Sequence, residues 1–97
     1  MEFNLSEEDL WSLFLKQNKR CAITGMDLWF SDVGNRKNKL SQNASLDRID
    51  SDLGYNIDNV QWVHKKINIM KGKLKTEEFV GLCKLVCSNN KMNKVYD

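Results

Sequence analysis

Asp47 and Asn68 carry the side chains whose types and spacing most directly suggest chemistry in this chain. Asp47 lies near the end of one short segment, and Asn68 lies on a later segment with helical periodicity. Carboxylate and carboxamide oxygens are hard ligands that suit magnesium or manganese better than zinc. A small basic domain that holds such an ion is suited to phosphodiester chemistry, so the pair points to a metal-dependent nuclease.

The elements that must position these two side chains can be read from the pattern around them. Residues 44–49 alternate in a way that predicts a strand, and residues 60–63 predict a second short strand. Between them, residues 51–58 contain Gly54 and Asn56 and predict a turn-rich loop. The period changes to that of a helix after the second strand, which gives a strand, loop, strand and helix unit.

The helix of this unit begins at His64. Spacings of four and three residues place His64, Asn68 and Lys71 on one face of it. The opposite, inward edge is expected to carry Val63, Ile67 and Met70.

Two further helices are expected to flank the unit. Residues 6–18 have an apolar stripe and begin at Ser6, which is a helix-capping residue; residues 76–88 form the second helix. The segment 21–25 predicts a short strand or a tight knuckle that turns at its glycine, and residues 31–42 predict an exposed loop. The chain is therefore expected to be one small α+β domain over residues 1–97. Its core is expected to include Trp11, Phe14, Trp29, Trp62 and Phe79. The apolar side of the last helix is expected to carry Phe79, Val80, Cys83, Val86 and Cys87.

The central unit resembles the ββα-metal core of the H-N-H endonucleases. That family carries Asp-His-Ile, then an asparagine, then a histidine or asparagine nine residues beyond it; here Asp47-Arg48-Ile49, Asn59 and Asn68 stand in those places. The resemblance covers about residues 21–73. It implies that Asp47 and Asn68 bind one Mg²⁺ or Mn²⁺ ion, that Asn59 holds the two strands together through backbone hydrogen bonds, and that the substrate is DNA.

Arg48 occupies the position at which the family carries its histidine general base. A guanidinium stays protonated near neutral pH and cannot take a proton from water. Asp50 or His64 could act as the base instead, and Arg48 could hold the scissile phosphate electrostatically. Two alternatives stay open: a DNA-binding module that has lost cleavage, and an interaction domain on the same scaffold.

The net charge of +2 is too small to indicate DNA binding by itself. The basic residues expected to contact phosphate are Lys65, Lys66, Lys71 and Lys73. Double-stranded DNA is the expected partner, with a homodimer or additional domains as sources of specificity. No segment is long and apolar enough to suggest a membrane partner.

Cys21, Cys83 and Cys87 are an odd number of cysteines without a framework spacing, which favours a reducing, cytoplasmic setting. The resemblance implies a bacterial or phage origin. Many family members brace the core with two Cys-x-x-Cys knuckles, of which only Cys21 remains here, opposite Thr24. The three cysteines and His64 could form a tetrahedral zinc site if the last helix folded back, but structural zinc is not expected.

Overall fold

The computed structural model describes residues 4–30 and 42–90, and nearly all of the loop expected at 31–42 lies outside these ranges. The described elements are α1 (Glu7–Lys16), β1 (Ala44–Arg48), η2 (Ile57–Asn59), β2 (Val60–His64), α2 (Lys65–Lys71) and α3 (Thr76–Asn90). The expectation of a small α+β domain with an N-terminal and a C-terminal helix is confirmed. No helix of the described residues is long and apolar enough to cross a membrane.

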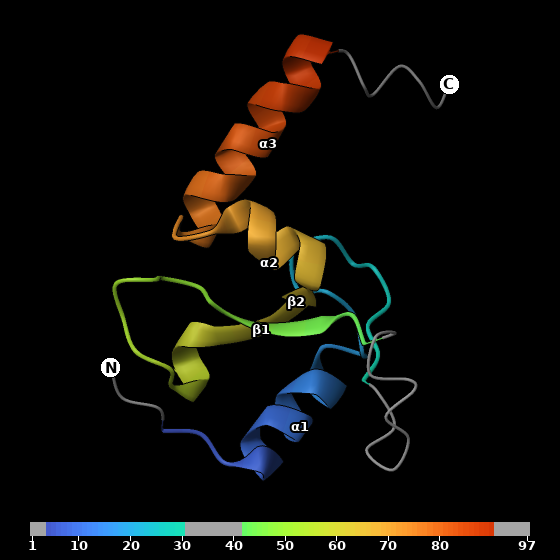
Figure 1. The fold of residues 1–97 in the computed structure, drawn as a ribbon, viewed down its shortest axis with the longest axis vertical. Coiled ribbons are helices and arrows are strands. Elements are labelled where there is room, and N and C mark those ends of the chain that lie inside the picture. Colours follow the sequence, from blue (N-terminus) through green and yellow to red (C-terminus); the bar gives the residue numbers. More distant parts are fainter. Residues whose placement is uncertain (1–3, 31–41, 91–97) are drawn as a thin grey trace.

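Strands β1 and β2 pair as an antiparallel hairpin. The register sets Leu46 opposite Trp62 and Asp47 opposite Gln61. Because side chains alternate between the faces of a strand, these two pairs point to opposite sides of the hairpin. Helix α1 lies on one side of the hairpin and α2 lies on the other (Figure 1). The side that carries Asp47 therefore faces the helix that carries Asn68.

Helix α1 begins where its sequence predicts. The Ser6 hydroxyl accepts a hydrogen bond from the Asp9 amide, and the Asp9 carboxylate accepts one from the Ser6 amide, which forms a capping box. After α1 ends, the Gln17 side chain hydrogen-bonds to both the backbone amide and the carbonyl of Trp62. This contact ties the end of α1 to β2.

The hydrophobic core lies between α1 and the hairpin. Phe14, Phe30 and Trp62 pack edge to face, with ring centroids 4.7 to 6.2 Å apart. The Trp62 indole N–H donates to the Leu10 carbonyl, so its polar atom is satisfied within the core. Trp11 and Trp29 are about half exposed, so their expected placement in the core is wrong; Trp11 only packs on the rim, against Phe14 and Phe30.

Helix α3 is longer than expected and is buried at only one residue, Phe79. Its residues Val86 and Cys87 are exposed, which corrects the prediction that they pack inward. Met70 on α2 is also exposed rather than inward. The C-terminal part of α3 extends away from the hairpin (Figure 1).

Candidate functional site

A small cavity of about 110 Å³ lies beside the end of β1 that carries Asp47. Residues from β1, from the loop after it and from the end of α2 line this cavity. The lining includes Asp47, Arg48, Asn68 and Lys73 from the predicted site, together with Ser51 and Tyr55. The structure thus brings both predicted metal ligands to one cavity, although Asn68 follows Asp47 by a hairpin loop, a strand and part of a helix.

Asp47 is buried, and both of its carboxylate oxygens accept hydrogen bonds. Oδ1 accepts from the Lys71 ammonium at 3.2 Å, and Oδ2 accepts from the Gln61 side-chain amide at 2.9 Å. Gln61 also donates to the Thr76 hydroxyl at 3.0 Å. Lys71 is fully buried and also donates to the Arg48 carbonyl at 2.9 Å. The carboxylate is therefore oriented by neighbours on β2 and α2.

Lys71 was expected to contact phosphate, and the structure corrects this. Its side chain is 0 % exposed, so the ammonium faces Asp47 and has no access to solvent. A buried lysine requires a partner of opposite charge because desolvation of an unpaired ammonium is costly. The other three expected phosphate contacts, Lys65, Lys66 and Lys73, are exposed. Of these, Lys73 lines the cavity.

Asn68 is held on α2 with its side chain directed to β1. Its amide nitrogen donates to the Ser45 hydroxyl at 2.6 Å. Ser45 and Asp47 are two residues apart on one strand, so they share the face that meets α2. Because the side-chain nitrogen of Asn68 is the donor to Ser45, its oxygen remains the atom suited to bind a cation.

Arg48 lines the cavity from the strand end. Its guanidinium carbon lies 4.9 Å from the centre of the Tyr55 ring, and one of its N–H groups donates to the Leu53 carbonyl at 3.1 Å. Stacking on an aromatic ring and a backbone hydrogen bond restrict the rotamers of a long side chain. Sequence reasoning missed Tyr55 and Ser51 as lining residues, and an aromatic residue in a loop rich in polar residues was the available signal for Tyr55.

Asn59 organises the loop between the two strands. Its side-chain oxygen accepts from the Asp50 amide at 2.9 Å, and its nitrogen donates to the carbonyls of Asp50 and Gly54 at 3.0 and 2.9 Å. The Asn59 carbonyl in turn accepts from the Ile49 amide at 2.8 Å. These are backbone hydrogen bonds of the kind implied for this asparagine, and they fix the loop that follows β1.

The two alternative bases do not line the cavity. The Asp50 carboxylate accepts a hydrogen bond from the Asp52 amide and lies 3.7 Å from the Lys75 ammonium, so it belongs to the turn. His64 is the N-cap of α2, where its Nδ1 accepts from the Lys66 amide at 3.1 Å. It pairs with Ala44 at one end of the hairpin, whereas Arg48 lies at the other end. Ala44 and Asp47 are three residue steps apart along β1, a rise of roughly 10 Å.

Cys21 lies in the knuckle between α1 and β1. Its Sγ accepts a hydrogen bond from the Thr24 amide, and the turn closes at Gly25, which has a positive φ of 77°. Burial alone would raise the pKa of the Cys21 thiol. Hydrogen bonds from the Thr24 side chain and backbone, and from the backbones of His64 and Ile23, outweigh burial and lower this pKa from its ordinary value.

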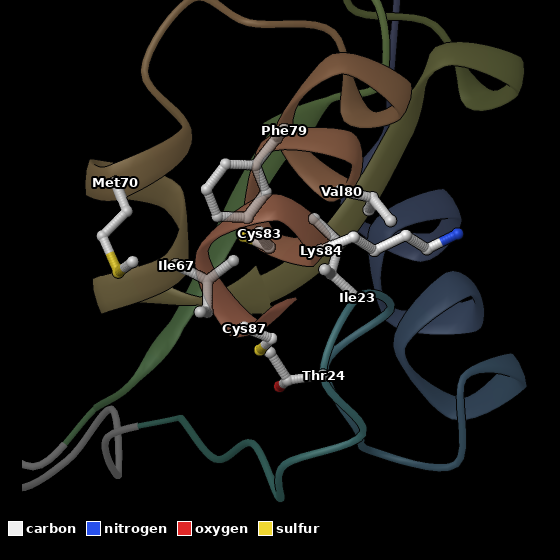
Figure 2. A pocket seen from close by; sticks show the side chains of 9 residues that line it. All are labelled: Ile23, Thr24, Ile67, Met70, Phe79, Val80, Cys83, Lys84 and Cys87. Atoms are coloured by element: carbon white, nitrogen blue, oxygen red, sulfur yellow. The ribbon is translucent and has the colours of Figure 1, made fainter. Parts of the chain in front are cut away.

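A larger, mostly apolar groove of about 400 Å³ separates this knuckle from α2 and α3. Figure 2 shows Cys83 and Cys87 on α3 facing it, with Thr24 beside Cys87 and Phe79 next to Ile67 of α2. Cys21 and His64 are not among the residues that line it. Across residues 4–30 and 42–90, no three His, Cys, Asp or Glu side chains come together closely enough to hold a metal ion.

The chain matches no model of a known protein family, and no curated protein matches its sequence.

Proposed function

We propose that this protein is a divalent-metal-dependent endonuclease of H-N-H type that hydrolyses phosphodiester bonds in DNA. The observation that supports the proposal best is the shared cavity, which Asp47 and Asn68 line together with the basic residues Arg48 and Lys73. Two oxygen ligands beside two cations are suited to hold a metal ion and a phosphate group next to each other.

The side chains suited to a magnesium or manganese ion are those of Asp47 and Asn68, which supply hard oxygens to one cavity. Two protein ligands would leave most of an octahedral shell to water and phosphate, which is usual for Mg²⁺. An ion held there supplies Lewis-acid stabilisation of charge on the phosphate and on the leaving oxygen.

The protein's own cations have a separate task. Arg48 is held by Tyr55 and Leu53 and presents a fixed guanidinium, which can bind two phosphate oxygens at once. Lys73 is exposed beside the same cavity and adds a flexible positive charge. These two residues would orient the scissile phosphate, because positioning is a large part of phosphodiester hydrolysis.

One specific observation favours a second candidate function, DNA binding without cleavage. Among the described residues that line the cavity, Asp47 carries the only carboxylate, and no histidine is present. Arg48 cannot accept a proton, while Asp50 and His64 serve the turn and the helix cap. A site of this composition binds phosphate more readily than it activates water.

Conversion of supercoiled plasmid to nicked or linear DNA, with Mg²⁺ or Mn²⁺, distinguishes the two functions. Under the nuclease proposal, cleavage requires the metal and is lost in Asp47→Asn and Asn68→Ala. Asp58→Asn is the matched control. Because Asp58 is exposed on η2, this variant should cleave the plasmid as the native protein does. Intact plasmid under every metal, together with DNA binding that weakens as salt rises, would replace the nuclease proposal with the binding function.

A further inference from the structure

The Lys71 ammonium already occupies one oxygen of the Asp47 carboxylate. It donates to Asp47 Oδ1 at 3.2 Å and to the Arg48 carbonyl at 2.9 Å. Both acceptors belong to residues that line the cavity. Carboxylate and backbone carbonyl oxygens are also the kinds of atom that bind Mg²⁺ or Ca²⁺. The ammonium thus uses oxygen acceptors that a divalent ion could use as well.

This ion pair is shielded from water more completely than a surface salt bridge. The Lys71 and Asp47 side chains are 0 % and 4 % exposed. Charges in such a setting interact strongly, because little solvent screens them. One carboxylate neutralises one ammonium, so the pair offers no net negative charge to an incoming divalent ion.

We infer that Lys71 is the resident counter-cation of Asp47 and that a divalent ion binding at Asp47 competes with the Lys71 ammonium. The inference rests on the proposed function, since it takes Asp47 to be a metal ligand. It adds a regulatory property: the free protein binds the ion weakly, and a DNA phosphate at Arg48 and Lys73 supplies the negative charge that favours metal binding. Metal and DNA therefore bind cooperatively, each raising the affinity for the other.

Binding of Mn²⁺ to the free protein, measured by electron paramagnetic resonance on the full chain, tests this competition. Lys71→Met removes the ammonium and keeps a long side chain, so Mn²⁺ should bind about tenfold more tightly than to the native protein. Lys84→Met removes one exposed positive charge on α3 and should leave Mn²⁺ affinity within about twofold. Asp47→Asn in the Lys71→Met background should abolish the gain.

Lys71→Met leaves a buried carboxylate without its partner, so its folding must be checked by circular dichroism. Lys71→Gln is the second variant, because it removes the charge but keeps a neutral hydrogen-bond donor on the side chain. Competition further predicts that saturating Mn²⁺ raises the unfolding temperature of either variant more than that of the native protein, since the ion replaces the missing cation.

The outcomes separate the inference from the proposal beneath it. Equal Mn²⁺ affinity in the native protein and both Lys71 variants, with loss in Asp47→Asn, would overturn competition and leave the metal site intact. Absence of Mn²⁺ binding in every variant, even with a DNA duplex added, would overturn both. Tighter binding that persists in Asp47→Asn would place the ion elsewhere and also overturn the inference.

Discussion

The Asp47 carboxylate and the Lys71 ammonium form a buried ion pair with 3.2 Å between Oδ1 and Nζ. The two residues come from β1 and α2, so the contact joins the hairpin to the helix that packs on it. The same carboxylate lines the candidate site. Substitutions at Asp47 therefore act on the fold and on the site together, and experiments must separate the two effects.

Asp47→Ala should destabilise the protein by about 3 to 5 kcal/mol, because it leaves the Lys71 ammonium buried without a counter-charge. Asp47→Asn should cost less, since its amide oxygen can still accept a hydrogen bond from Lys71. Urea denaturation followed by circular dichroism measures both losses. Asp58→Ala is the control, because it removes an exposed carboxylate. A loss below about 1 kcal/mol in Asp47→Ala would contradict the energetic importance of the pair.

Asn59→Ala should destabilise the protein by about 2 to 3 kcal/mol, because it removes three hydrogen bonds to the backbone of Asp50 and Gly54 in a buried setting. Plasmid cleavage, or DNA binding, should also decrease in this variant, because the loop beside the cavity loosens. Thermal unfolding measures the loss of stability. Asn56→Ala is the control. Asn56 lies in the same loop but is exposed, so its substitution should change the stability by less than about 0.5 kcal/mol. Equal losses in the two variants would refute this role.

Local signals predicted the elements of this fold well. The capping residue Ser6, the alternation in 44–49 and the turn-rich loop each specify structure through nearby residues, so the helix α1 and the hairpin follow from them. The burial of Lys71 could not be predicted in this way. It depends on the strand register, which turns Asp47 towards α2, and a lysine one turn after Asn68 otherwise indicates a solvated face.

Tertiary packing also decided which apolar residues are buried. Trp11 and Trp29 have the large apolar side chains that are typical of core residues. However, Phe14, Phe30 and Trp62 already fill the space between α1 and the hairpin. The site showed the same limit. The motif pointed to Asp47, Arg48 and Asn68, which line the cavity, whereas Tyr55 lines it through the path of a loop that periodicity does not describe.

Arg48→Ala should weaken binding to duplex DNA and lower the slope of log affinity against log salt by about one phosphate contact. The reason is that Arg48 is a fixed cation beside the cavity, held against the Tyr55 ring. Fluorescence anisotropy with a labelled duplex at several salt concentrations measures the slope. Arg20→Ala is the control, since Arg20 is exposed and pairs with Asp27 on the knuckle. An unchanged slope in Arg48→Ala, or the same change in both variants, would show that Arg48 does not contact the DNA.

Cys21 should make the stability depend on pH. Because hydrogen bonds at the knuckle lower the pKa of its thiol, the folded protein releases the proton at a lower pH than the unfolded chain. The Cys21 contribution to the free energy of unfolding is therefore fully present above the ordinary thiol pKa, and is lost as the pH falls through the lowered value. Cys21→Ser cannot ionise in this range and lacks the contribution. Urea denaturation under reducing conditions, between about pH 6 and pH 9, should show the native protein gaining stability over Cys21→Ser as the pH rises. A stability difference that stays constant or shrinks with pH would mean that the knuckle does not stabilise the thiolate.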